Sequence, residues 1–258
     1  MLNKALILGL IGLACLPGCA EQPADTSTAV KDTRCDYISE TRLRIEGFIN
    51  DDLLNCVNNG RPELVTTVIV DTPGGNIRAA LEIARQFPDG LELIIDGDCH
   101  SSCANYYVPL AKKLTFRPNA LIILHGSNDK GLADVIRPEK TEAEIAEIEE
   151  TGRRQAAFAR DYNIHPGWLF IRTKADYINS SLGRHVAGII DTDIAETPSE
   201  PIKIKSVVVY EPLIRSCFPN MEINGISDAR IQTFKLDTPM RKSLVAQGIV
   251  GSGTLRCV

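Results

Sequence analysis

Short apolar runs alternate with segments of helical periodicity along most of this 258-residue chain. Compact β-branched runs are typical of buried strands, and apolar residues spaced three or four apart are typical of a helix with one buried face. Strands are therefore expected at residues 42–46, 65–71, 91–96, 121–124 and 206–210, and helices at residues 76–87, 102–111 and 142–162. Strand–helix–strand repeats with connections of this length predict an α/β fold with a parallel core sheet.

The start of the chain predicts export. Lys4 gives a positive beginning, residues 5–16 are apolar, and Leu16-Pro17-Gly18-Cys19 follows. About a dozen apolar residues are too few to span a bilayer, which needs roughly 20. The segment resembles a bacterial lipoprotein signal, in which Cys19 becomes the lipidated first residue; an ordinary cleaved secretory signal is the alternative. Ala20 in place of an aspartate favours the outer membrane, so we expect a lipid-anchored periplasmic protein.

Composition divides the chain into four segments and argues against one class of partner, nucleic acid. Residues 1–18 are expected to be a signal peptide, 19–34 a flexible tether, 35–198 the main domain, and 199–258 a C-terminal tail that follows the turn-rich Pro198-Ser199-Glu200-Pro201. A net charge of −5 and a pI near 5.5 argue against a nucleic-acid partner. Membrane contact is expected only through the N-terminal lipid.

Six cysteines remain beyond residue 19. An even number in an exported chain favours disulfides over free thiols, although sequence alone does not fix the pairing. Proximity in the chain favours the pairs Cys35–Cys56, Cys99–Cys103 and Cys217–Cys257. A metal site that uses Cys99, Cys103 and His100 is the alternative, but no second ligand pair follows at zinc-site spacing. We therefore expect no metal and no cofactor.

Three short motifs carry the chemistry. They are Asp71-Thr72-Pro73-Gly74-Gly75, Gly97-Asp98-Cys99-His100-Ser101-Ser102-Cys103 and Pro118-Asn119-Ala120-Leu121-Ile122-Ile123-Leu124-His125, and each one follows or contains a predicted strand. A serine at a strand-to-helix corner supplies a nucleophile, a histidine supplies a base, and free backbone N–H groups near a Gly-Gly turn can hold an oxyanion. Together they predict an acyl-transfer site.

The same motifs resemble those of the Clp protease proteolytic subunit and the wider Clp/crotonase superfamily, over roughly residues 43–193. Ser101 lies four residues after Gly97, His125 lies seven after Pro118, and Asp176 precedes Gly188-Ile189-Ile190-Asp191 by a dozen. The resemblance implies a ββα superhelix, a triad of Ser101, His125 and Asp176, and an oxyanion hole formed by the N–H groups of Gly75 and Ser102. The Cys-x-Ser-x-Cys motif departs from the cytosolic protease and looks like that of exported Clp-like proteins.

We therefore expect an exported serine hydrolase, a peptidase acting on short or unfolded peptides, with homo-oligomer formation as a further expectation. Several alternatives stay open at this point. Ser101 could be only a helix N-cap, Ser102 could be the nucleophile, or Lys112 or Lys113 could be the base. A crotonase-type acyl-CoA enzyme and a non-catalytic binding or scaffold protein are further alternatives. His100, His165 and His185 lie outside the motifs and are interpreted as structural or surface residues.

The predicted helix at residues 142–162 is highly charged and carries a thin apolar stripe of Ile145, Ile148, Ala156 and Phe158. A charged helix of this kind often has only a solvated outer face. The family resemblance implies instead a projecting helix that packs between subunits or covers the substrate.

Overall fold

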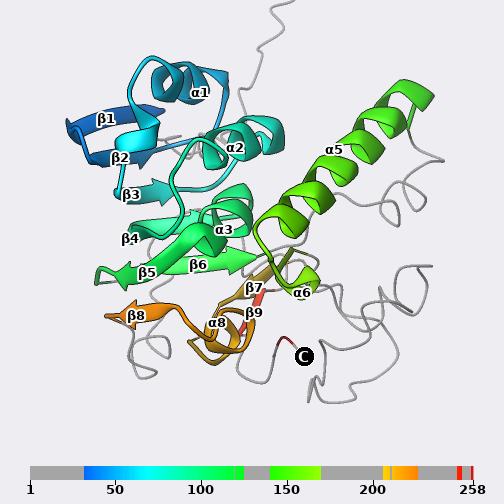
Figure 1. Ribbon diagram of the computed structural model, residues 1–258. Coiled ribbons are helices and arrows are strands. Elements are labelled where there is room, and N and C mark those ends of the chain that lie inside the picture. The colour runs from blue at the N-terminus through cyan, green and yellow to red at the C-terminus, as the bar shows by residue number, and fades with distance from the viewer. Residues whose placement is uncertain are drawn as a thin grey trace, which may run out of the picture.

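A parallel-dominated sheet with helices packed beside it forms the centre of the molecule (Figure 1). The computed structural model describes residues 32–118, 120–124, 140–169, 206–209, 211–225, 249–251 and 257. The strands are β1 (Arg34–Ser39), β2 (Arg42–Glu46), β3 (Thr67–Thr72), β4 (Leu91–His100), β5 (Ala111–Phe116), β6 (Leu121–Leu124), β7 (Ser206–Val208), β8 (Glu222–Asn224) and β9 (Ile249–Gly251). The helices are α1 (Asp51–Asn58), α2 (Ile77–Ala84), α3 (Ser102–Tyr106), α5 (Glu142–Asp161), α6 (Pro166–Leu169) and α8 (Glu211–Cys217), with 3₁₀ turns η1 (Pro62–Leu64) and η2 (Val108–Leu110).

The sheet runs in the order β1-β2-β3-β4-β6-β7-β9, and β5 and β8 branch from β4. β2, β3, β4 and β6 pair in parallel, and the β1–β2 and β6–β7 pairs are antiparallel. The predicted α/β class with a parallel core is therefore confirmed. Alternate residues of β3 face the helices, where Val68 and Val70 are buried, and Ile69 is buried on the opposite face. Burial on both faces explains the nearly continuous apolar run of this strand.

β4 changes partners along its length. Its first half, from Leu91 to Ile95, pairs with β5, and its last three residues, Asp98 to His100, pair with β6. The change occurs at Gly97, where an added Cβ would lie 2.4 Å from the Asp71 carboxylate, and that carboxylate accepts a hydrogen bond of 3.0 Å from the Asp98 N–H. Glycine at position 97 therefore lets the end of β3 contact β4 where the sheet divides.

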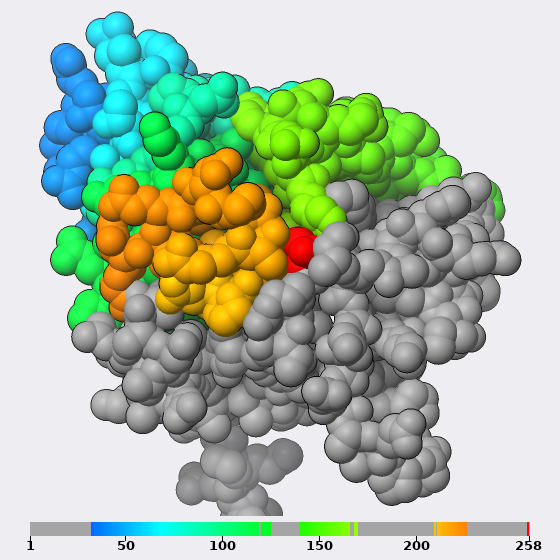
Figure 2. Space-filling view, turned by 60° about the horizontal axis from the view of Figure 1, so that its bottom comes forward, coloured from blue at the N-terminus to red at the C-terminus, as the bar shows by residue number. Residues whose placement is uncertain are grey.

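Helices α1, α2 and α3 pack one after another beside the strands, and α5 extends diagonally past α2 (Figure 1). α5 begins with a capping box between Thr141 and Glu144, and it buries Ile145 and Phe158 from the predicted stripe. It also buries Gln155, which the sequence does not mark as a core residue. Figure 2 shows α8 and β8, in yellow and orange, on the same face of the molecule as α5. None of the helices within the described ranges is long and apolar enough to cross a membrane.

Two predicted boundaries around β4 are wrong. The strand expected to end at residue 96 continues to His100, because the polar stretch after Ile95 is supported by Asp71 and β6. The helix expected at 102–111 ends at Tyr106, and a 3₁₀ turn containing Pro109 leads into the unpredicted strand β5. Proline lacks the N–H that would continue an α-helix. The unpredicted β1 pairs with β2 as an edge strand.

The six cysteines beyond residue 19 form three disulfides in the structure. They join Cys35 to Cys56, Cys99 to Cys103 and Cys217 to Cys257, with Cα–Cα distances of 6.3, 5.3 and 4.9 Å. This is the pairing that proximity in the chain favours. It also argues against the metal-site alternative, because Cys99 and Cys103 carry no free thiolates.

The signal segment, the predicted lipidation residue Cys19 and the predicted boundary at residues 198–199 lie outside the described residues.

Candidate active site

Ser101 occupies a strained turn between the end of β4 and the start of α3. Its backbone angles are φ 53° and ψ −121°, a left-handed conformation that is uncommon for a residue with a side chain. Two hydrogen bonds hold this conformation: the Ser101 N–H donates to the Ile123 carbonyl at 3.0 Å, and the Asn105 N–H donates to the Ser101 carbonyl at 2.8 Å. Such strain costs on the order of 1–3 kcal/mol and gathers at functional sites, including the strand-to-helix turns that expose nucleophilic serines.

The environments of the two adjacent serines separate their roles. Ser101 stands at the N-cap position of α3, yet within the described chain its side chain makes no capping hydrogen bond, and the residue is partly exposed. Ser102 is only 1% exposed, and its hydroxyl donates to the Gly75 carbonyl at 3.2 Å. The geometry therefore argues against Ser101 as a simple N-cap and against Ser102 as the nucleophile.

The Gly74-Gly75 turn lies directly against the strand-to-helix turn of His100, Ser101 and Ser102, which we call the serine corner. A Cβ on Gly74 would lie 2.5 Å from the His100 carbonyl oxygen, 2.8 Å from the Ser101 Cβ and 3.1 Å from the Ser102 nitrogen. Gly74 has φ 86°, and its N–H donates to the hydroxyl of buried Thr72 at 3.0 Å. The absence of a side chain at Gly74 lets the turn approach the serine corner this closely.

Gly75 is held against Ile49 in the segment before α1. The Ile49 N–H donates to the Gly74 carbonyl at 2.9 Å, and the Asn76 N–H donates to the Ile49 carbonyl at 2.8 Å. These two bonds form an isolated β-bridge between Ile49 and Gly75, and neither of them uses the Gly75 N–H. Ser102 is the first residue of α3, where the N–H has no acceptor in the helix. Among the described residues neither N–H donates a backbone hydrogen bond. Within the described part of the chain, the two N–H groups therefore remain candidate donors to an anionic oxygen.

The Cys99–Cys103 disulfide spans the serine corner. Cys99 belongs to β4, where it is opposite Ile122 of β6, and Cys103 belongs to α3. Both cysteines are fully buried. The bond therefore ties the strand to the helix on either side of Ser101, and it restricts how far these two elements can separate.

Helix α3 is fixed from its other side by α5 and α6. The Trp168 Nε1–H donates to the Ala104 carbonyl at 2.9 Å, and the Tyr106 hydroxyl donates to Gln155 Oε1 at 2.6 Å. The Tyr106 ring also packs edge-on against Phe158. Burial raises the pKa of Tyr106, so its hydroxyl stays protonated and able to donate. Phe158 belongs to the predicted apolar stripe, whereas Trp168, Tyr106 and Gln155 were not predicted as supporting residues. The single tryptophan of the chain is a signal that could have drawn attention to this contact.

His100 and Asp98 form a buried pair immediately before Ser101. They are 4% and 8% exposed, and His100 Nε2 lies 3.5 Å from Asp98 Oδ1, at ion-pair distance but without hydrogen-bond geometry. Residues two apart on a strand share a face, so both lie on the face of β4 opposite Cys99. His100 is thus a buried residue rather than a surface one.

The Ser–Lys alternative does not fit the strand order. Lys113 lies opposite Glu92 near the start of β4, and their side chains form an ion pair of 3.0 Å. Ser101 follows the other end of this ten-residue strand, which is about 30 Å of extended chain away. The hydrogen bond from Lys113 to Glu92 also raises the pKa of the lysine, whereas a lysine base needs a lowered one. Lys112 adjoins Lys113 on β5.

The structure brings together Ser101, Ser102 and Gly75 of the predicted site. His125 and Asp176 lie outside the described residues. β6 ends at Leu124, the residue before His125, and the Ile123 carbonyl of this strand accepts the Ser101 N–H. The described part of the third motif therefore contacts the serine corner.

Comparison with known proteins gives only distant structural similarity. The sequence matches no protein-family model and no curated protein. Among solved structures, a mutant of ClpP1 from Listeria monocytogenes is 18% identical, with 48% of this chain and 75% of that chain covered and a TM-score of 0.32. A putative enoyl-CoA hydratase/isomerase from Novosphingobium aromaticivorans is 13% identical, with 49% and 62% covered and a TM-score of 0.27. A putative enoyl-CoA hydratase/isomerase from Acinetobacter baumannii is 12% identical, with 46% and 66% covered and a TM-score of 0.26.

Proposed function

We propose that this protein is a serine hydrolase of the Clp-like type, a peptidase, with Ser101 as its nucleophile. One observation carries the proposal: a partly exposed serine is held at φ 53° between a strand and a helix, with a glycine turn packed against it. The Ser101 side chain makes no capping hydrogen bond within the described chain, so helix capping does not account for a serine at this strained position. A nucleophile that must reach a substrate carbonyl does account for it.

In the proposed reaction the Ser101 Oγ attacks the carbonyl carbon of a peptide bond while His125 takes the hydroxyl proton. The Gly75 and Ser102 N–H groups then bind the oxygen that becomes negative. His125 returns the proton to the leaving amine as the C–N bond breaks, and a water molecule hydrolyses the Ser101 ester by the same steps. Asp176 would orient His125 and stabilise its protonated form. The roles of His125 and Asp176 rest on motif spacing.

The proposed location is the bacterial periplasm, with a lipid on Cys19 that anchors the protein in the outer membrane. The three disulfides support this proposal, because such bonds persist in oxidising compartments and are rare in the cytosol. ATP-driven unfolding partners are not expected there, so the substrates would be short or already unfolded peptides. The projecting helix α5 is the surface that we assign to homo-oligomer contact.

A small fluorophosphonate probe tests the function. The purified protein without its signal should react with it, because activated serines are phosphonylated while ordinary serines are not. Ser101→Ala should abolish the reaction, and Ser102→Ala should retain it at a lower rate, since the Ser102 hydroxyl only supports the Gly75 carbonyl. A folded wild-type protein that does not react would favour the non-catalytic binding alternative instead.

A further inference from the structure

A cleft of about 480 Å³ opens between α2 and α5, and Gly75 is among the residues that line it. This volume lies within the range of about 300–1,000 Å³ that is usual for ligand pockets. Ile77 and Leu81 contribute an apolar wall from α2, and Glu147, Glu150 and Arg154 contribute charged groups from α5. Gly75, whose N–H belongs to the proposed oxyanion hole, is one of the residues that line the cleft, so the cleft and the proposed hole share this glycine.

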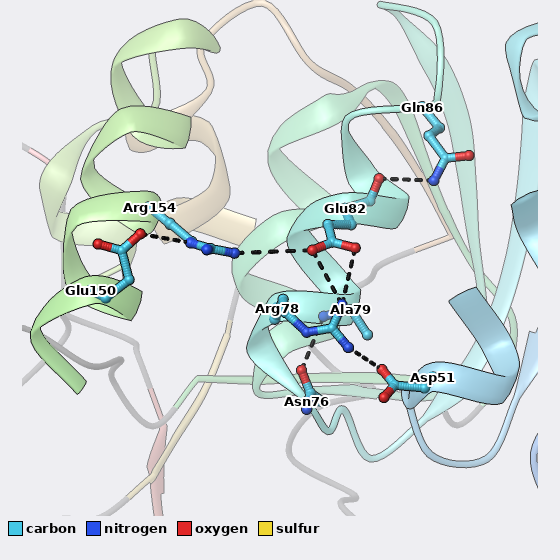
Figure 3. A network of polar contacts seen from close by, with 8 residues as sticks. All are labelled: Asp51, Asn76, Arg78, Ala79, Glu82, Gln86, Glu150 and Arg154. Carbon is cyan, nitrogen blue, oxygen red and sulfur yellow. Dashed lines mark hydrogen bonds and ion pairs between the residues drawn. The ribbon is translucent and has the colours of Figure 1, made fainter. Parts of the chain in front are cut away.

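The arginines of the cleft are already neutralised (Figure 3). Arg78 lies between Asp51 of α1 and Glu82 of α2, with which it forms ion pairs. Arg154 pairs with Glu150 at 2.9 Å and reaches Glu82 at 4.0 Å. Each guanidinium therefore has two carboxylate neighbours. Hydrogen bonds from Arg154 and Arg153 lower the pKa of Glu150, so this carboxylate is ionised and committed to those two arginines.

Glu147 is the remaining charge on the cleft wall. It is exposed, lies one helical turn before Glu150 and Thr151, and makes no ion pair with any residue that the structure describes. The cleft thus combines an apolar wall, two compensated arginines and one carboxylate without a counter-ion. A ligand that complements it has an aliphatic stem and a positive end.

We propose, on the basis of the proposed function, that this cleft binds a lysine or arginine side chain of the substrate peptide. We assign the side chain to the residue whose carbonyl reacts, because Gly75, which would hold the oxyanion, also lines the cleft. Its methylene stem lies along Ile77 and Leu81, as long cationic side chains do on apolar surfaces, and its charged end pairs with Glu147.

Two peptidyl diphenyl phosphonates test this proposal, one with lysine and one with norleucine attached to the phosphorus. Norleucine keeps the stem of lysine and lacks its charge, so the pair isolates the ion pair with Glu147. In each probe the Ser101 Oγ–phosphorus bond forms as one phenol leaves. The lysine probe should react roughly 1.5- to fivefold faster than the norleucine probe at low salt, the range expected for one exposed ion pair. Added salt should reduce this preference.

Glu147→Gln should bring the two rates together, and Glu149→Gln is the matched control, since Glu149 lies on the same helix outside the cleft wall and should leave the preference intact. Equal rates in the wild type, or a lysine preference that survives Glu147→Gln, would overturn the subsite. A fluorophosphonate reaction of the wild type with equal phosphonate rates rejects the subsite alone. No reaction with the small fluorophosphonate rejects the proposed function, and the subsite with it.

Discussion

Gly74 lies against Ser101 so closely that a Cβ added to the glycine would lie 2.8 Å from the serine Cβ. Two residues from different motifs, 27 positions apart in the chain, are thereby packed into one corner. The contact explains why a Gly-Gly turn accompanies the serine: the turn must approach the backbone of His100 and Ser102 as well as Ser101 itself. The close approach gives the most specific test of the site geometry.

Gly74→Ala should displace the Ser101 corner and slow fluorophosphonate labelling by roughly 10²-fold, since misplacement by about 1 Å can cost that much. Gly90→Ala is the matched control. Gly90 also has a positive φ, 81°, but its nearest neighbours would lie 3.7 Å from an added Cβ. Gly90→Ala should cost about 1–2 kcal/mol of backbone energy in denaturant unfolding, and Gly74→Ala should cost more, because its Cβ would also lie 2.5 Å from the His100 carbonyl oxygen. A Gly74 variant that labels as fast as the Gly90 variant would contradict the proposed contact.

The Cys99–Cys103 disulfide is expected to position the nucleophile more than it stabilises the fold. Replacing both cysteines by alanine should slow labelling by roughly tenfold or more, because the strand and helix around Ser101 are released. The Cys35–Cys56 bond, which spans 21 residues, is the control. Chain-entropy estimates give about 3 kcal/mol for that loop and about 2 kcal/mol for the shorter one. Calorimetry should therefore show the larger loss of stability in the variant without the Cys35–Cys56 bond. The variant without the Cys99–Cys103 bond should show the larger loss of labelling rate.

Much of the core could be predicted from sequence because its pattern is local. β3 is a β-branched run buried on both faces, and α2 has apolar residues at helical spacing behind an Asn76 cap. β1 and β5 escaped prediction because their sequences, Arg-Cys-Asp-Tyr-Ile-Ser and Ala-Lys-Lys-Leu-Thr-Phe, are polar or only half buried. Their pairing with β2 and β4 makes them strands, and pairing is not visible in a short segment.

The candidate site, like the fold, could be predicted from the sequence only in part. The motifs marked the Gly-Gly turn and the serine corner, which the structure brings into contact. The left-handed φ of Ser101 and the hydroxyl bond from Ser102 to Gly75 depend on tertiary packing. The bonds from Trp168 to Ala104 and from Tyr106 to Gln155 join residues 64 and 49 positions apart, and no local pattern predicts them. His125 and Asp176 stay predictions.

The assignment of Asp176 is tested by Asp176→Asn. If the residue orients His125, this change should lower the rate of peptide hydrolysis on the order of 10⁴-fold while leaving stability nearly unchanged. Turnover on a quenched fluorescent peptide and the midpoint of thermal unfolding measure the two effects. A variant that retains more than about a tenth of the activity would show that another group supports the base.

The lipid anchor is tested at Cys19. The wild-type protein, expressed in a bacterium, should partition into the detergent phase and carry acyl mass on the N-terminal cysteine. Cys19→Ser should instead remain in the aqueous phase. Equal partitioning of both proteins into the aqueous phase, with no acyl mass on the wild type, would support an ordinary cleaved signal.

The central claim is that Ser101 is the reacting nucleophile, and tandem mass spectrometry of the fluorophosphonate-treated protein tests it most directly. The peptide that contains Ser101 and Ser102 should carry one phosphonyl group, and the fragment ions should assign it to Ser101. The buried hydroxyl of Ser102, which donates to the Gly75 carbonyl, should stay unmodified. A phosphonyl group on Ser102, or on any serine outside this corner, would contradict the account.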